Sequence, residues 1–188
     1  MQIINFKITG INKLVMHNQR MADPLDPFAK QLSAISSKRK KTDEDHEEMA
    51  WVEFQGSIYH DVEIGPYIPA TWLDRTFVGG ARKTKRGKDA EVGVMVIDNQ
   101  VPLQYVGPRD IPTLWKEKFR LRNGVKVQQA RVIRTRPLFN GWSAQFAMSF
   151  DPEIFNRDEV ISIMETAGKI IGIGDWRPRY GRFTVEVA

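Results

Sequence analysis

Alternating apolar and polar positions at both ends of the chain predict β-strands. In residues 2–8, Ile4, Phe6 and Ile8 share one face, and residues 182–187 repeat this pattern. The longest alternation, over 142–150, sets Trp142, Ala144, Phe146, Met148 and Phe150 against small or polar residues. A fully apolar run inside 92–97 predicts a buried strand, and Val15 ends a short extended segment.

Two segments between these strands have the signals of helices. Pro69 opens a predicted helix over 70–79, which Gly79-Gly80 either ends or uses for a close backbone approach. Asn156 and Glu159 form a capping-box pattern before apolar residues at helical spacing. This pattern predicts a helix over 157–167 with Gly168 as its C-terminal glycine.

The remaining segments have weaker patterns. We expect a strand or hairpin in 51–64, a short strand in 103–106, and a loop with one helical turn in 108–115. Asn123-Gly124 predicts a hairpin turn between 119–122 and 125–135, and Asn140-Gly141 predicts the turn before the 142–150 strand.

Residues 18–50 are interpreted as an insertion over the core. Asp26-Pro27 predicts a short helix to about residue 35, and Thr42 is placed to cap another helix whose first turn is acidic. The basic run 38–41 and the acidic run 43–48 either pair with each other or serve a function.

Without the insertion, the predicted order is β-α-β-β-α-β, which is the ferredoxin-like order. We therefore predict an α+β fold: one ferredoxin-like domain, 1–188, with an antiparallel sheet, helices on one face, an inserted helical lobe and a β-hairpin. RNA-recognition domains use this topology.

Composition restricts the class of protein. Of the 188 residues, 41% are hydrophobic, enough for a core, and none is cysteine, which excludes disulfides and thiolate metal sites. The N-terminus does not resemble a signal peptide, and no apolar run approaches a membrane span. We expect a cytoplasmic protein with no membrane contact.

Positive charge is concentrated in particular segments. The net charge is +5, but residues 75–88 hold six basic residues and no acid, and 116–136 hold eight basic residues and one acid. Such segregation indicates at least one positive face, as found in proteins that bind nucleic acid.

The most specific segment is the glycine loop, which we define as residues 167–183. Its glycines, Gly172 and Gly174 among them, would let a flexible backbone approach a phosphate. Arg177, Arg179 and Arg182 supply charged donors, and Trp176 and Tyr180 supply faces on which bases stack. The alternative is a tight turn with buried aromatics and a few surface arginines.

The glycine loop resembles the C-terminal glycine-rich loop of the RAMP superfamily, the proteins that build CRISPR effector complexes. Residues 67–75, continuing to Ala81-Arg82, resemble the first-helix start of the family's backbone subunits. The two motifs cover about 30 residues in the expected order, although Ala70-Thr71 and Gly79-Gly80 depart from the family's small-residue and Lys-Gly-Ala patterns. The resemblance implies guide or single-strand binding and head-to-tail assembly along the strand. The departures, with a chain shorter than most backbone subunits, fit a relative that stands alone in a phage or mobile element.

The predicted partner is therefore single-stranded nucleic acid, RNA or DNA, bound without catalysis, with a homo-oligomer or filament as a further expectation. A basic loop at 82–88 would contact phosphates, with arginines of the 125–136 run lining a sheet face or edge; a solvated basic surface is the alternative. Outside the glycine loop, the predicted contacts are Arg75, Arg82, Lys83, Lys85, Arg86, Lys88, Arg131, Arg134 and Arg136.

Two other functions stay open. The resemblance also implies a metal-dependent endoribonuclease, since some backbone subunits cut RNA with an aspartate on an N-terminal loop; Asp23 or Asp26 beside His17 would serve here with Mg²⁺, although Asp-Pro pairs commonly start turns. No other cofactor is expected, because the histidines lack metal-ligand spacing. The second alternative is a phage assembly or inhibitory module that docks through residues 18–50.

Overall fold

The computed structural model describes residues 1–127 and 129–188 and shows a mixed α+β protein with antiparallel sheets. One sheet has the strand order β10-β1-β9-β5. Its strands are β1 (Gln2–Gly10), β5 (Val94–Val96), β9 (Ser143–Phe150) and β10 (Phe183–Val187). The alternating segments thus form the predicted strands. The apolar run forms a shorter strand than expected, and the prediction that it is buried is wrong, because Met95 is 57% and Ile97 is 44% exposed.

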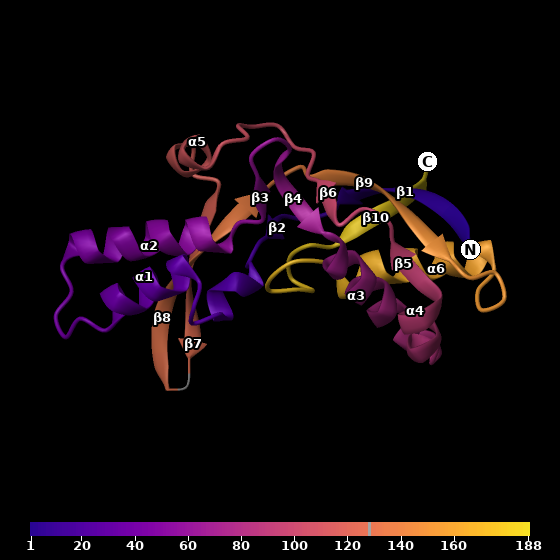
Figure 1. Ribbon diagram of the computed structural model, residues 1–188, viewed down its shortest axis with the longest axis horizontal. Coiled ribbons are helices and arrows are strands. Elements are labelled where there is room, and N and C mark those ends of the chain that lie inside the picture. The colour runs from indigo at the N-terminus through magenta and orange to yellow at the C-terminus, as the bar shows by residue number, and fades with distance from the viewer. Residues whose placement is uncertain (128) are drawn as a thin grey trace.

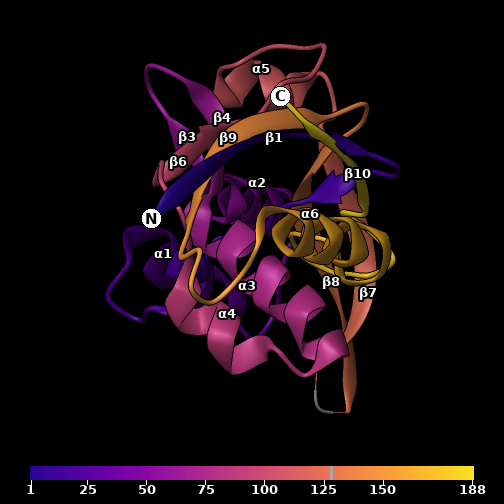
Figure 2. The same ribbon diagram turned by 90° about the vertical axis from the view of Figure 1, so that its right-hand side faces the viewer.

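Helices cover one face of this sheet, as Figure 2 shows beneath the arch of β1, β9 and β10. They are α3 (Ala70–Ala81) and α6 (Arg157–Thr166), and α4 (Gly87–Gly93) packs against α3. Phe6 on β1 lies opposite Phe146 on β9, and both are buried on the helix side. The alternate residues Asn5 and Gln145 are exposed on the other face, so the period of two separates core from solvent.

The β7–β8 hairpin extends away from the rest of the chain (Figure 1). It consists of β7 (Arg120–Val127) and β8 (Ala130–Phe139), which also pairs with β2 (Leu14–Val15). The predicted turn at Asn123-Gly124 is wrong: these residues pair with Arg134 and Ile133 in mid-strand. Gln128, inside the predicted run 125–135, lies outside the described residues. The turn at Gly141, with φ of 56°, is confirmed.

A helical lobe lies beside this hairpin, where Figure 1 shows α1 and α2 side by side. It contains the 3₁₀ helix η1 (Gln19–Ala22), α1 (Pro27–Ser36) and α2 (Asp43–Ser57). The helices starting at Pro27 and after Thr42 are confirmed, but the strand expected at 51–57 is wrong. The capping box of Thr42 and Asp45 starts a helix that continues to Ser57, and Phe54 packs against Trp115 of α5 (Ile111–Lys116).

Other predicted boundaries also change. The expected loop 82–88 is the 3₁₀ helix η2 (Arg82–Thr84) followed by the start of α4. The strand expected at 103–106 lies earlier, as β6 (Gln100–Pro102), which pairs with β4 (Gly65–Pro69); β4 pairs on its other side with β3 (His60–Asp61).

Glycines explain how the helices meet. Gly79-Gly80 lies inside α3, and a Cβ at Gly80 would lie 2.7 Å from the Ile163 carbonyl oxygen of α6, so the close approach is confirmed. Gly168 does not end α6, which continues into the π-helical turn η3 (Ala167–Ile171). Gly172, with φ of 73°, ends it instead.

Among the residues that the structure describes, no helix combines the length and the apolar character that crossing a membrane requires.

Candidate nucleic-acid interface

The glycine loop is anchored at its start by α3. The hydroxyl of Thr76, which is buried, donates a 2.8 Å hydrogen bond to the carbonyl of Gly172. The Ile173 amide donates to the Gly181 carbonyl at 2.9 Å, which closes the base of the loop. A Cβ at Gly181 would overlap the carbonyl oxygen of Ile173, so glycine is required for this closure.

The same loop is hydrogen-bonded along its length to β2 and to the segment before β2. The Asp175 amide donates to the Val15 carbonyl at 2.8 Å, and the Gly181 amide donates to the Lys13 carbonyl at 2.9 Å. Asn12 donates to the Arg179 carbonyl and accepts from the Arg182 amide. The expected flexible turn is therefore a loop whose backbone is fixed by hydrogen bonds.

Gly172 and Gly174 allow the backbone of this loop to turn and pack closely, and they do not face a ligand. Both have positive φ, 73° and 80°. A Cβ on Gly174 would lie 2.5 Å from the Val15 carbonyl oxygen, and one on Gly172 would lie 2.9 Å from that of Gly181. The expectation that these two glycines approach a phosphate is replaced by a packing role.

The side chains at the tip are the accessible part. Arg177 and Arg179 are exposed, and the half-buried rings of Trp176 and Tyr180 have centroids 6.2 Å apart. Trp176 has φ of 53°, a left-handed conformation that costs a non-glycine residue about 1–2 kcal/mol. Such a conformation persists where surrounding bonds impose it, and here the Asp175 carboxylate accepts from the Trp176 amide at 3.0 Å.

Arginines from separate parts of the chain meet in one cavity of about 700 Å³. Arg75 lies on α3, Arg82 on η2 and Arg177 in the glycine loop, and all three line it. The apolar side chains of Val78 and Met95 also contribute to the lining. The structure therefore brings together residues that the sequence separates by about a hundred positions.

Two acids lie in the same cavity. Glu91 pairs with Arg82 at 2.9 Å, and both side chains are largely exposed. Burial raises the pKa of Asp74, an effect that the hydrogen bond from the Val96 amide only partly offsets. Asp74 thus places a costly negative charge beside the arginines.

Arg86 is not part of this exposed surface. Its guanidinium donates to Asp89 at 2.6 Å and to Glu159 at 2.9 Å, and it lies 4.3 Å from the Phe155 ring centroid. It joins α4 to α6, so the expected phosphate contact is replaced by a structural one. Lys83, Lys85 and Lys88 are exposed beside it.

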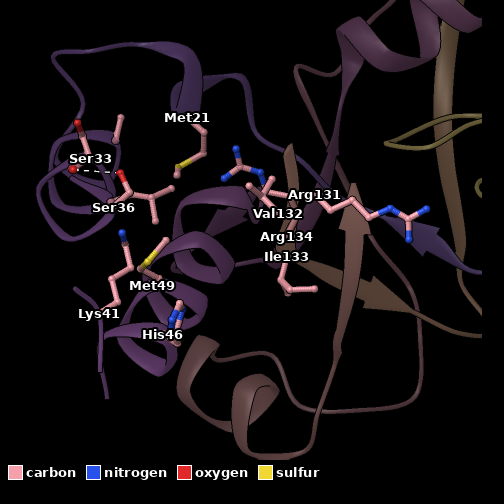
Figure 3. A pocket seen from close by; sticks show the side chains of 12 residues that line it. Met21, Ser33, Ser36, Lys41, His46, Met49, Arg131, Val132, Ile133 and Arg134 are labelled. Atoms are coloured by element: carbon pink, nitrogen blue, oxygen red, sulfur yellow. Dashed lines mark hydrogen bonds between the residues drawn. The ribbon is translucent and has the colours of Figure 1, made fainter. Parts of the chain in front are cut away.

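The arginines of β8 likewise divide into those paired with acids and one that is exposed. Arg136 is buried between Glu53 at 2.7 Å and Asp175 at 3.3 Å, and Arg134 pairs with Glu53 at 3.3 Å. These bonds remove Arg136 from the expected contact surface. Arg131 is exposed and lines a different cavity beside α1 and α2 (Figure 3). Arg182 is half-buried in the glycine loop.

The nuclease candidates have local structural partners. Asp23 accepts from the Leu25 amide at 2.8 Å, and Asp26 caps α1 and pairs with Arg20 at 2.7 Å. Desolvation raises the pKa of Asp26, but bonds from Arg20 and the Phe28 amide outweigh it, so the pKa is lowered. Within the described residues, no group of three or more histidines and acids is placed to hold a metal ion.

His17 lies apart from these acids. Its Nδ1 is 3.3 Å from the Ser57 hydroxyl, and burial and the nearby Arg136 lower its pKa. It lines a small cavity of about 190 Å³ with Glu53, Arg134 and Arg136.

Sequence reasoning missed the residues that hold the site. Glu53, Thr76 and Asp175 connect α2, α3 and β8 to the glycine loop. Asp175 immediately precedes Trp176, so its position in the motif was a usable signal. Glu53 gave none, because it fell in a segment predicted to be a strand.

No protein family matches the chain, and no curated protein is similar enough to count as a relative. Its geometry therefore carries the functional argument.

Proposed function

We propose that the protein binds single-stranded nucleic acid without cleaving it. The observation that carries this proposal is that Arg75, Arg82 and Arg177 line one cavity beside the exposed Arg179 and the Trp176–Tyr180 pair. Arginines bind phosphates with paired donors, and aromatic faces stack on unpaired bases. A duplex keeps its bases stacked inside, so this combination favours a single strand.

The ligand would lie along the loop edge of the sheet and not across its open face. RNA-recognition domains stack bases on aromatic residues of the sheet face. Here that face carries Asn5, Gln145 and Thr184, and its Lys7 pairs with Glu186 at 3.6 Å. The aromatic pair lies instead in the glycine loop.

We infer further that the core is ferredoxin-like and related to the RAMP superfamily. The strand order β10-β1-β9-β5, with α3 between β1 and β5 and α6 between β9 and β10 in the chain, supports this inference. The two resembling motifs are also in contact. Thr76 bonds to Gly172, and a Cβ at Gly174 would touch Trp72 of α3 at 3.4 Å.

Binding can be tested by fluorescence anisotropy with labelled single- and double-stranded RNA and DNA at about 50 and 200 mM salt. We expect single strands to bind more tightly and to lose affinity steeply as salt rises. Arg177→Glu with Arg179→Glu should weaken binding about tenfold or more, since it reverses phosphate contacts.

The matched control reverses two lysines away from the site. Lys30 on α1 and Lys116 on α5 are exposed, so Lys30→Glu with Lys116→Glu changes the net charge equally. Equal losses from the two double variants would reduce the effect to net charge and reject the site. Both variants should unfold at the same urea concentration as the unmodified protein.

The resemblance also suggests assembly along the strand. Light scattering with and without a long single strand tests this, because strand-dependent assembly requires the oligonucleotide. Oligomers of the same size without it would favour a protein-assembly function instead.

A further inference from the structure

A second cavity, of about 610 Å³, lies between α1, α2 and β8, away from the glycine loop. Figure 3 shows that its side chains come from all three elements, with Ser33 and Ser36 on α1, Met49 and His46 on α2, and Ile133 on the strand. We call this cavity the lobe groove.

Aliphatic side chains form much of the lobe groove. Ile133 is 59% exposed in the middle of β8, where it pairs with Gly124, which offers no side chain to cover it. The other aliphatic residues of the lining are half-buried. Apolar residues that gather around an open cavity mark binding surfaces, and methionine adapts to varied partners. The aliphatic lining residues are Met21, Ala29, Leu32, Met49, Val132 and Ile133.

The charged groups around these residues are basic. Lys41 and Arg131 line the groove as cations, His46 lines it as an imidazole, and Arg134 lines it while pairing with Glu53 at 3.3 Å. Among the described residues that line the groove, none is an aspartate or a glutamate. Arg131 also lies opposite Lys126 in the hairpin. Like charges directly opposite each other destabilise strand pairing, so the hairpin keeps this positive charge at some cost.

We propose that the lobe groove binds an acidic amphipathic helix of a protein partner. The aliphatic residues would accept the apolar face of such a helix, and the basic rim would pair with its acids. The proposal is independent of nucleic-acid binding at the glycine loop.

Two other occupants fit the groove less well. Nucleic-acid bases stack most strongly on phenylalanine, tyrosine and tryptophan, and the described lining residues include none of these three, with His46 as their aromatic ring. A second copy would have to offer its acidic helix α2, but Ala50 and Val52 there are buried and Asp45 pairs with Lys38 at 2.5 Å. That helix thus exposes acids without apolar anchors beside them.

The test uses a fluorescein-labelled peptide of about 18 residues, roughly five helical turns. It has leucine at helical spacing along one face and glutamate and alanine elsewhere. A scrambled peptide and a peptide with lysine for each glutamate serve as comparisons. We expect the full-length protein to bind the acidic amphipathic peptide saturably and at least about tenfold more tightly than either comparison.

Variants then locate the binding site. Ile133→Glu should weaken binding of the acidic peptide about tenfold. The matched control is Ile3→Glu, because Ile3 is 58% exposed in β1, and its effect should stay within about twofold. Arg131→Glu should weaken binding of the acidic peptide and strengthen binding of the lysine peptide. Oligonucleotide affinity of Ile133→Glu should equal that of the unmodified protein.

Four results would overturn the proposal. The scrambled or lysine peptide would bind as well as the acidic one, or Ile133→Glu would bind that peptide unchanged. If Ile133→Glu weakened oligonucleotide binding as much as peptide binding, the groove would belong to the nucleic-acid surface. If the unmodified protein formed dimers that Ile133→Glu dissociates, the occupant would be a second copy.

Discussion

The guanidinium of Arg136 and the carboxylate of Glu53 lie 2.7 Å apart, with side chains only 8% and 6% exposed. The Thr135 amide also donates to Glu53 at 2.7 Å, and Arg136 reaches Asp175 at 3.3 Å. One buried ion pair therefore connects α2, β8 and the glycine loop. It fixes where the helical lobe lies relative to the proposed binding surface.

Replacing Arg136 should destabilise the protein strongly. Arg136→Met leaves Glu53 buried with weaker neutralisation from the more distant Arg134, which costs about 3 kcal/mol. Urea unfolding followed by tryptophan fluorescence measures this loss.

A control and a rescue separate this pair from a general charge effect. Arg131→Met, at an exposed position of the same strand, should change stability by less than about 0.5 kcal/mol. Glu53→Gln combined with Arg136→Met should recover part of the loss, because it neutralises the deeply buried Glu53 and leaves only the partly exposed Arg134 and Asp175 without their former partners. A double variant less stable than Arg136→Met would contradict this account.

His17 should make stability depend on pH. Burial, reinforced by the charge of Arg136, lowers the pKa of His17 in the folded protein below the ordinary value of 6.5. The unfolded chain then takes up the proton first, so stability falls as pH drops below about 6.5. His17→Gln should lose less stability than the unmodified protein between roughly pH 7.5 and 5.5.

The comparison for His17 is the exposed His46. The His46→Gln variant should follow the unmodified protein across the same pH range in urea unfolding. Parallel curves for His17→Gln and the unmodified protein would show that His17 does not cause the acid destabilisation.

Closure of the glycine loop should require Gly181. Gly181 has φ of 74°, and a Cβ there would overlap the Ile173 carbonyl oxygen. Gly181→Ala should therefore cost at least about 3 kcal/mol, from the conformation and the overlap together. Thermal unfolding measures the cost.

Gly141 is the matched glycine for this experiment. It also has positive φ, 56°, but a Cβ there meets nothing within 4 Å. Gly141→Ala should cost only about 1 kcal/mol, from the conformation alone. Equal costs at the two positions would mean that the loop relaxes around the added methyl group.

Long alternating patterns predicted the sheet well because they record burial directly. The 142–150 alternation became β9, and the capping box at Asn156 started α6 as expected. In each of these two patterns, several residues indicate the same element, which makes the prediction more secure than one residue would. The short run at 51–54 was predicted as part of a strand or hairpin, but it lies in the helix that the capping box at Thr42 starts, because so short an apolar run does not fix the period.

Local preference failed where more distant pairing outweighed it. Asn123-Gly124 favours a turn, but Arg120–Val127 pairs continuously with Ala130–Pro137, and this ladder adds bonds beyond the dipeptide. Asp89, three residues after Arg86, was a local signal for an ion pair, but nothing in the basic run 82–88 indicated Glu159 as the second partner. Which arginines are free for a ligand depends on acids far away in the sequence.

Neutralising Asp74 should strengthen nucleic-acid binding. Asp74 lines the cavity with Arg75, Arg82 and Arg177, where its charge repels a phosphate. Asp74→Asn removes that charge and keeps the oxygen that accepts from the Val96 amide at 2.9 Å. We expect affinity for a single strand to rise about threefold to tenfold in anisotropy at low salt.

Asp74→Asn should not destabilise the folded protein. Because burial raises the pKa of Asp74, its charged form is disfavoured in the folded state, and the neutral asparagine should be at least as stable at neutral pH. The affinity gain should shrink as salt screens the cavity. Asp98→Asn, at an exposed position outside the cavity, should leave affinity within about twofold. A gain as large at Asp98 would mean that net charge alone governs binding, and an unchanged affinity at Asp74 would place the phosphates elsewhere.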